Sequence, residues 1–315
     1  MWSLVRAACL GAIWLVPALS AAQDLTPRAY LPLPVSSNAI GLTYAFSRGD
    51  ILFDPTVPIT DVTGTIHSPV ASYYHAFDFF GRSANVTGVF PFAVGDIRGN
   101  LGGEGATAHR AGMADAVLRF AVNLRGGKAL TLGEFVKAVP ARSVWGTSIK
   151  VVAPTGQYDP PRLINIGSNR WAVKPELGYS GRVGPLLLDV YTGVWFFTVN
   201  DEYFVLDPNA PPNRRSQSPI GAFELHVSYD VKPRLWISAD VNYWRGGRTS
   251  VNSVESTGSL QANSRVGLTG SVPISRRQSI KVSYSDGLVV RFGGRFRILS
   301  LGWQYAWVGQ PRPSN

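Results

Sequence analysis

The chain has 315 residues, of which 16% are charged and 45% are hydrophobic, and its formal net charge at pH 7 is +10. A basic balance can signal nucleic-acid binding, but the Lys and Arg residues are scattered, so we expect no nucleic-acid partner and favour contact with anionic lipid headgroups. The only cysteine, Cys9, lies in the first segment. This position excludes disulfides, thiolate metal ligands and cysteine nucleophiles from the rest of the chain.

Residues 1–22 have the features of a secretory signal peptide. Arg6 supplies a positive start, residues 7–16 are apolar, and residues 20–22 are small, as cleavage requires. The apolar run is about ten residues long, well short of the roughly 20 that a spanning helix needs. We therefore expect export through the general secretory route and a mature chain that starts at Gln23.

Residues 23–38 form a segment rich in proline. Pro27, Pro32 and Pro34 exclude a helix and favour an extended arm. The arm could enter the lumen of a barrel as a plug or hang free in the periplasm. We favour the free arm.

From residue 39 onward, apolar and polar side chains alternate with the period of a β-strand. Ile40, Leu42 and Tyr44 interleave with small or polar residues. About twelve such runs follow one another, with a range of 10–14, and no apolar run after residue 22 is long enough for a spanning helix. The pattern predicts an all-β fold, a transmembrane antiparallel up-and-down β-barrel over residues 39–308, with residues 309–315 as a short tail.

Short and long connections alternate along the chain, as an up-and-down outer-membrane barrel requires. Residues 126–140 break the pattern, and we expect a short helix there. A soluble β-sandwich also alternates, but the signal segment, the aromatic strand ends and the alternating connections favour the membrane barrel. The short connections are 81–83, 181–185, 232–233 and 273–277, and the long ones are 48–67, 96–111, 154–169, 200–218 and 245–263.

The sequence carries no recognisable catalytic or metal-binding motif. The four histidines are not spaced as metal ligands, and neither HExxH nor GxSxG occurs, so we predict no metal, no cofactor and no enzymatic activity. Glu224, His226 and Ser228 do share one strand face. A barrel hydrolase acting on lipid, with Ser228 and His226, is therefore an alternative, although an ordinary polar lumen face is favoured.

Charged residues at alternate positions predict a wet inner face. Lys174 and Glu176 are spaced to face the same way, with Asp189 on the neighbouring strand. They could form a structural ion pair or a gate that guides a ligand. The predicted lumen-lining residues are Arg119, Lys150, Lys174, Glu176, Asp189, Glu224, His226, Asp240, Arg265 and Lys281.

Residues 154–175 carry the most specific motif, PTGQYD followed by LINIGSNRW and KP. This segment resembles the outer-membrane family named for the meta-pathway of phenol degradation, which has a PTG-Y-D turn and an N-G-NRW run followed by KP at this place. The resemblance implies a β-barrel that lets hydrophobic or aromatic compounds cross the bacterial outer membrane, and it brings no catalytic residues. We expect Gly156 and Gly167 to permit turns with positive φ, and Trp171 to lie at the outer lipid interface.

The leading hypothesis is passive uptake of a small hydrophobic ligand through an outer-membrane barrel. Its expected partners are outer-membrane lipid, lipopolysaccharide and the barrel assembly machinery. A non-conducting structural or adhesive barrel is a further alternative. The candidate residues for ligand contact at the loops are Tyr158, Asp159, Asn165, Asn169, Arg170, Trp171, Trp195, Phe197 and Tyr203.

Overall fold

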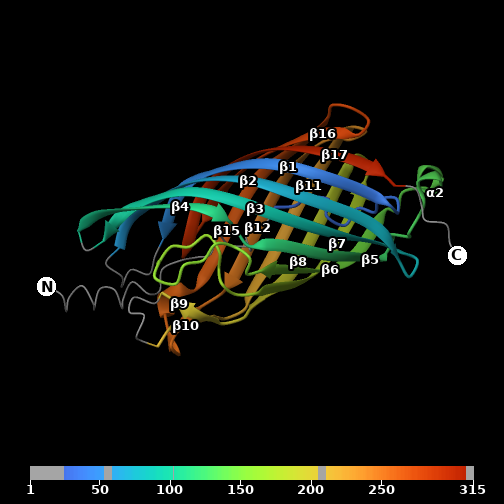
Figure 1. The fold of residues 1–315 in the computed structure, drawn as a ribbon. Coiled ribbons are helices and arrows are strands. Elements are labelled where there is room, and N and C mark those ends of the chain that lie inside the picture. The colour runs from blue at the N-terminus through green and yellow to red at the C-terminus, as the bar shows by residue number, and fades with distance from the viewer. Residues whose placement is uncertain (1–24, 53–58, 102, 205–210, 310–315) are drawn as a thin grey trace.

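The computed structural model describes residues 25–52, 59–101, 103–204 and 211–309. The predicted signal peptide and residues 310–315 lie outside these ranges. Within them the chain forms a closed antiparallel barrel of 12 strands (Figure 1), which confirms the predicted fold class. The barrel strands are β1 (Ser37–Leu52), β2 (Ile59–Phe79), β3 (Arg82–Leu101), β5 (Ala116–Arg125), β6 (Ser143–Ala153), β7 (Ala172–Val183), β8 (Leu186–Phe197), β11 (Ile220–Lys232), β12 (Leu235–Gly246), β15 (Gln261–Pro273), β16 (Gln278–Val289) and β17 (Gly293–Val308).

The first and last strands close the barrel. β1 pairs with β17 over their whole lengths, from Ser37 opposite Val308 to Leu52 opposite Gly293. All other neighbours in the barrel are consecutive along the chain, apart from the short strands between them. Closure leaves no unpaired edge within the barrel wall, which is the condition for strands to cross a lipid bilayer.

The two faces of the wall have the reverse of the polarity found in a soluble protein: apolar side chains point outward and polar side chains point inward. On β12, Ile237 is 56% exposed and Val241 39%, whereas Asp240 between them is 1% exposed and Asn242 is fully buried. A β-sandwich of a soluble protein would bury the apolar side chains and expose the polar ones. The apolar outer face and the polar inner face therefore exclude the sandwich and fit a barrel surrounded by lipid.

One end of the barrel, the short-turn end, carries tight connections. Turns with positive φ at Phe80 and Gly81, at Gly184 and at Arg234 join successive strands there. The predicted short helix is confirmed as α2 (Leu132–Lys137), and it lies at this end (Figure 1). No helix in the described ranges is long and apolar enough to span a membrane.

At the opposite, long-loop end, two of the predicted loops are wrong because strand pairing continues through them. β1 and β2 remain paired as far as Asp50 opposite Thr63, where residues 48–67 were expected to be a loop. Residues 96–111 form a hairpin in which β3 pairs with β4 (Glu104–Met113) around Gly103. β-Branched residues in these segments favour extended strands. The pairing of β2 with β3 continues past a register shift between Thr60 and Thr63.

The remaining long connections are ordered in different ways. Residues 200–218 and 245–263 contribute a small second sheet of four strands and a 3-10 turn, η1 (Thr257–Ser259). Residues 154–169 contain no strand, as predicted. The strands of the second sheet are β9 (Asn200–Tyr203), β10 (Asn213–Gln217), β13 (Thr249–Val251) and β14 (Val254–Glu255).

The N-terminal arm, residues 25–36, lies inside the barrel, so the free periplasmic arm was the wrong choice. Tyr30 is 1% exposed, and its ring fills the space above two glycines of the inner wall, Gly146 and Gly178. A Cβ at either glycine would collide with the ring. These two glycines on neighbouring strands create a seat for one aromatic side chain, which holds the arm in the lumen.

Candidate functional site

A buried ionic network lies on the inner face of β7, β11 and β12. The Lys174 ammonium contacts a Glu176 carboxylate oxygen at 2.5 Å and donates to Glu224 Oε1 at 3.1 Å. Each of these three side chains is at most 5% exposed. Because residues two apart on a strand face the same way, Lys174 and Glu176 meet as the sequence predicts. Glu224 joins the pair from β11, which lies on the far side of β8.

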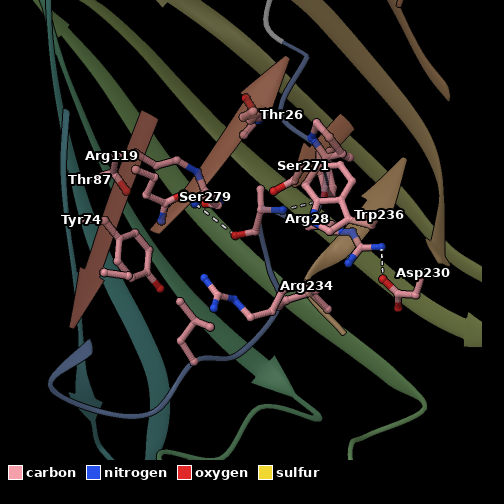
Figure 2. Close-up of a pocket in the computed structure, with 18 of the residues that line it drawn as sticks. Thr26, Arg28, Tyr74, Thr87, Arg119, Asp230, Arg234, Trp236, Ser271 and Ser279 are labelled. Carbon is pink, nitrogen blue, oxygen red and sulfur yellow. Dashed lines mark hydrogen bonds and ion pairs between the residues drawn. The ribbon is translucent and has the colours of Figure 1, made fainter. Parts of the chain in front are cut away.

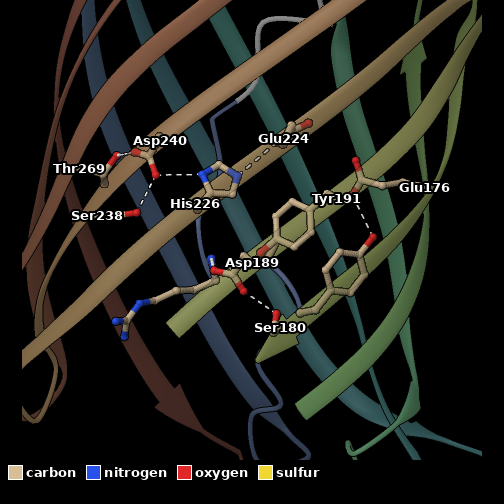
Figure 3. A network of polar contacts seen from close by, with 12 residues as sticks. Glu176, Ser180, Asp189, Tyr191, Glu224, His226, Ser238, Asp240 and Thr269 are labelled. Carbon is tan, nitrogen blue, oxygen red and sulfur yellow. Dashed lines mark hydrogen bonds and ion pairs between the residues drawn. The ribbon is translucent and has the colours of Figure 1, made fainter. Parts of the chain in front are cut away.

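His226 extends this network to β12 (Figure 3). Its Nδ1 lies 2.8 Å from Asp240 Oδ1, and its Nε2 lies 3.6 Å from Glu224 Oε2. Asp240 also accepts hydrogen bonds from Ser238 at 2.6 Å and Thr269 at 2.7 Å. These residues, from Lys174 to Asp240, are called the lumen network below, and they make one part of the barrel interior a buried polar core linked by ion pairs and hydrogen bonds.

Ser228 and His226 are not hydrogen-bonded to each other in the lumen network. Ser228 shares the inner face with Glu224 and His226, as expected, but it is fully buried, and within the described part of the chain its hydroxyl has no hydrogen-bond partner. His226 is engaged by carboxylates on both ring nitrogens. This arrangement differs from a Ser–His pair in which the serine hydroxyl is hydrogen-bonded to its base.

Asp189 lies on β8, the strand next to Lys174 and Glu176, as the sequence predicts, and it holds the N-terminal arm. Its carboxylate accepts from Ser180 at 2.5 Å and from the backbone N–H of Arg28 at 3.0 Å. The guanidinium of Arg28 reaches Asp230 at 2.6 Å. The arm is thus tied to the barrel wall by charged hydrogen bonds as well as by Tyr30.

Tyr30 connects the arm to the lumen network. Its hydroxyl donates to Glu176 Oε1 at 2.8 Å and lies 2.9 Å from Ser148 Oγ. The Arg119 guanidinium lies over the Tyr30 ring, 4.7 Å from its centroid. Together the arm and the network occupy the β6 to β12 side of the lumen.

A chamber of about 1330 Å³ remains beside the arm (Figure 2). Its lining includes Lys232, Pro233 and Arg234 from one short turn and Arg277 from another, so the chamber reaches the short-turn end. Arg28 and Trp236 line it together, with the guanidinium 4.4 Å from the indole ring centroid. The chamber is larger than the roughly 300–1,000 Å³ of an ordinary small-molecule site, so it has room for a small molecule to enter and move through it.

An aromatic layer lies on the inner face of the wall towards the long-loop end. Trp195 and Trp244 are fully buried on the inner face, with Ile220 and Ala222 beside them. Phe197 stacks on Trp195 with ring centroids 6.5 Å apart. Trp195 and Phe197 were expected on an outer capture loop, but they belong to β8 and lie on the inward-facing series of that strand.

The loop of residues 154–169 is firmly folded across the wall at the break between β4 and β5. The Asp115 carboxylate accepts from the backbone N–H of Gly156 at 2.9 Å, and from the backbone N–H and hydroxyl of Ser168 at 2.8 and 2.6 Å. Gly156 and Gly167 do not have the positive φ that was expected. They are needed because their backbones touch, and a Cβ on either would meet the other residue.

The loop candidates are spread over distinct environments. The Tyr158 hydroxyl donates to the Glu202 carbonyl at 3.0 Å, and burial raises the pKa of this phenol. The Asn165 side-chain oxygen accepts a hydrogen bond from the backbone N–H of Asp159 at 2.9 Å. These bonds make the family motif a structural clamp, and ligand contact by these residues stays a prediction.

The remaining candidates at this end also have defined places. Asn169 has a φ of 51° and donates to Asn200 at 3.1 Å. Arg170 is buried, with its guanidinium 4.5 Å from the Phe197 ring centroid, whereas the neighbouring Trp171 is 49% exposed. Tyr203 is buried in the second sheet.

All ten predicted lumen residues lie on the inner side of the wall. Seven of them are buried, and Arg119, Lys150 and Lys281 line the chamber. Among the described residues, no cluster of three or more His, Cys, Asp and Glu could hold a metal ion. Tyr30, Arg28 and Trp244 were not predicted from the sequence. The one available signal was the pair of glycines, Gly146 and Gly178, which leaves space on the inner wall for a large side chain such as Tyr30.

A closed antiparallel barrel with an apolar outer face and a charged, partly hollow interior defines the class of transmembrane outer-membrane β-barrels. Within this class, the chain belongs to the family described as the MetA-pathway of phenol degradation, whose model matches residues 46–303. This agrees with the resemblance carried by the PTGQYD and SNRW motifs.

A solved channel structure supports the fold. An outer membrane channel from Pseudomonas putida F1 is similar, with 18% identity and a TM-score of 0.75 over 90% of this chain and 100% of the other. The β-domain of the Bordetella autotransporter BrkA shares 11% identity, with a TM-score of 0.49 over 86% of this chain and 100% of the other. No curated protein matches the chain.

Proposed function

We propose that this protein is an outer-membrane channel for passive uptake of small hydrophobic or aromatic compounds. The observation that carries the proposal is the chamber of about 1330 Å³ inside the barrel, which reaches the short-turn end. Membership of the phenol-degradation family and similarity to a channel fold agree with this function. Outer-membrane barrels have short turns on the periplasmic side, so the chamber serves as the exit for a compound moving inward.

The aromatic layer lies on the entry side of the proposed route, as the chamber lies on the exit side. Trp195, Phe197 and Trp244 offer apolar rings to an aromatic solute. A solute that leaves this layer enters the chamber beside Val117, which lines the chamber and packs against the layer. Residues of the arm also line the chamber and narrow it, so movement of the arm widens the route; the arm's anchors at Arg28 and Tyr30 are a few hydrogen bonds.

The environment of the protein is part of the same proposal. Residues 1–22 direct export through the general secretory route, and the barrel assembly machinery inserts the chain among outer-membrane lipid and lipopolysaccharide. The band of exposed apolar residues on the outer wall, such as Leu42, Leu118 and Ile237, suits contact with lipid chains.

Uptake of a radiolabelled aromatic compound such as toluene tests the function. Bacterial host cells with and without the chain are compared at toluene concentrations low enough for outer-membrane passage to limit the rate. We expect faster uptake in cells that carry the chain. Equal uptake in both, with the barrel present and heat-modifiable on a gel, would instead favour the non-conducting structural barrel.

A further inference from the structure

One row of side chains crosses the inner wall in register. Tyr74 on β2 lies opposite Thr87 on β3, and Thr87 lies opposite Arg119 on β5. Arg119 lies opposite Lys150 on β6, which lies opposite Lys174 on β7. These five residues, the donor row, are two hydroxyls followed by three cations on five adjacent strands. Four of them line the chamber, and Lys174 is buried at the end of the row.

The donor row places like charges directly opposite one another, which destabilises a sheet unless anions compensate. Glu176 supplies one carboxylate, 2.5 Å from Lys174 and 3.9 Å from Arg119. Glu224 supplies a second to Lys174 but is shared with His226. Two carboxylates therefore face one arginine and two lysines, and the formal charge of the row retains a positive excess.

Arg119 is the member of the row best placed to bind a ligand. Its Nη2 atom is buried and makes no hydrogen bond within the described part of the chain, although it lies 3.9 Å from Glu176. Thr87 and Tyr74 stand next to it along the row (Figure 2). A guanidinium with an N–H that makes no hydrogen bond, between the Thr87 hydroxyl and the Lys150 ammonium, suits a planar oxyanion such as a carboxylate.

Apolar side chains adjoin the donor row on the side of the long-loop end. Val89 and Val117 are each two residues from a row member, face the same way, and lie opposite one another. Val117 also packs against the aromatic layer. An apolar surface therefore leads directly to a row of anion-binding groups.

The lining of the whole chamber also carries an excess of positive charge. Its lining contains eight Lys and Arg residues but only three acids, Glu176, Glu224 and Asp230, a formal difference of +5. A cavity with low-dielectric walls and charge of one sign concentrates counter-ions. The cationic residues are Arg28, Arg119, Lys150, Arg182, Lys232, Arg234, Arg277 and Lys281.

We propose that the donor row binds the carboxylate of small aromatic acids, with the ring against Val89 and Val117. The inference rests on the proposed channel function and names its substrate class. The carboxylate accepts hydrogen bonds from Arg119, Thr87 and Tyr74, and Lys150 adds charge. The cations at the short-turn end then favour release of the anion in that direction rather than return through the aromatic layer.

Isothermal titration of the full chain in detergent tests this site with three probes of the same ring: benzoate, benzyl alcohol and benzylammonium. A hydrogen bond to a charged group contributes about 1.5–3 kcal/mol, so we expect benzoate to bind at least about tenfold more tightly than either other probe. Arg119→Gln with Lys150→Gln weakens benzoate binding about tenfold or more, and Arg119→Lys retains part of it. Arg214→Gln, on the second sheet far along the chain from the row, is the control and leaves binding unchanged.

Benzoate binding no tighter than benzyl alcohol would overturn the inference, as would unchanged benzoate binding in the folded double variant. Should the double variant not fold, the comparison of the three probes on the unaltered chain decides alone. Toluene uptake with no preference for benzoate would overturn only the anion site. Preferential benzoate binding with no uptake of any aromatic compound would support the site and overturn the channel.

Discussion

Replacing Lys174 with methionine tests whether the lumen network is a stabilising core. The lysine is 2% exposed and lies 2.5 Å from Glu176 and 3.1 Å from Glu224, each 5% exposed. Removing one partner of a buried ion pair costs about 3–5 kcal/mol because it leaves uncompensated buried charge. We expect Lys174→Met to lower the free energy of unfolding by an amount in that range.

Guanidinium unfolding of the barrel in lipid vesicles, followed by tryptophan fluorescence, measures the loss. The matched variant adds Glu176→Gln and Glu224→Gln to Lys174→Met, which removes the stranded charges, and we expect it to regain most of the lost stability. A loss below about 1 kcal/mol for Lys174→Met, typical of solvent-exposed pairs, would refute a dry network and indicate that water reaches these groups.

Three further predictions address the arm, the long loop and the helix. Gly178→Ala places a Cβ against the Tyr30 ring, and overpacking costs about 1–3 kcal/mol, so guanidinium unfolding is expected at lower denaturant; an unchanged midpoint would mean that the ring is not seated there. Asp115→Ala removes three hydrogen bonds from the loop of residues 154–169, and limited proteolysis should cut this loop faster without changing barrel melting; equal cutting rates would contradict the clamp. Hydrogen bonds from the N-cap backbone N–H and hydroxyl lower the pKa of Glu134, so its contribution to α2 is present above the ordinary Glu pKa and is lost as pH falls through the lowered one; a carboxyl-carbon NMR titration at or above the ordinary value would refute the capping box.

Alternation was sufficient to predict the strands of the barrel and their outer face. In a lipid-embedded wall each residue faces either hydrocarbon or lumen, so the sequence of β12 or β17 records its orientation directly. Extensions beyond the membrane obey no such rule. Residues 59–67 and 96–101 are strand because they pair with neighbours, and their Gly, Asp and Thr content alone resembled a loop.

The interior of the barrel was harder to predict because it depends on contacts far apart in sequence. Nothing local to Tyr30 indicates that it rests on Gly146 and Gly178. Trp195 and Phe197 were predicted to lie on a capture loop, but they belong to β8 and lie on its inward-facing series. The charges of the lumen were predicted as a set, whereas their partners, such as Asp189 with Arg28, follow from the path of the arm.

The most direct test of the central claim, that the barrel is a conduit obstructed by its own N-terminal arm, is single-channel conductance in planar lipid bilayers. The unaltered chain is compared with Arg28→Ala combined with Tyr30→Ala, which removes the arm's anchors at Asp230 and Glu176. The account predicts small or infrequent openings for the unaltered chain and larger, longer openings for the variant. Equal conductance of the two proteins, both folded by heat-modifiable migration, would contradict it.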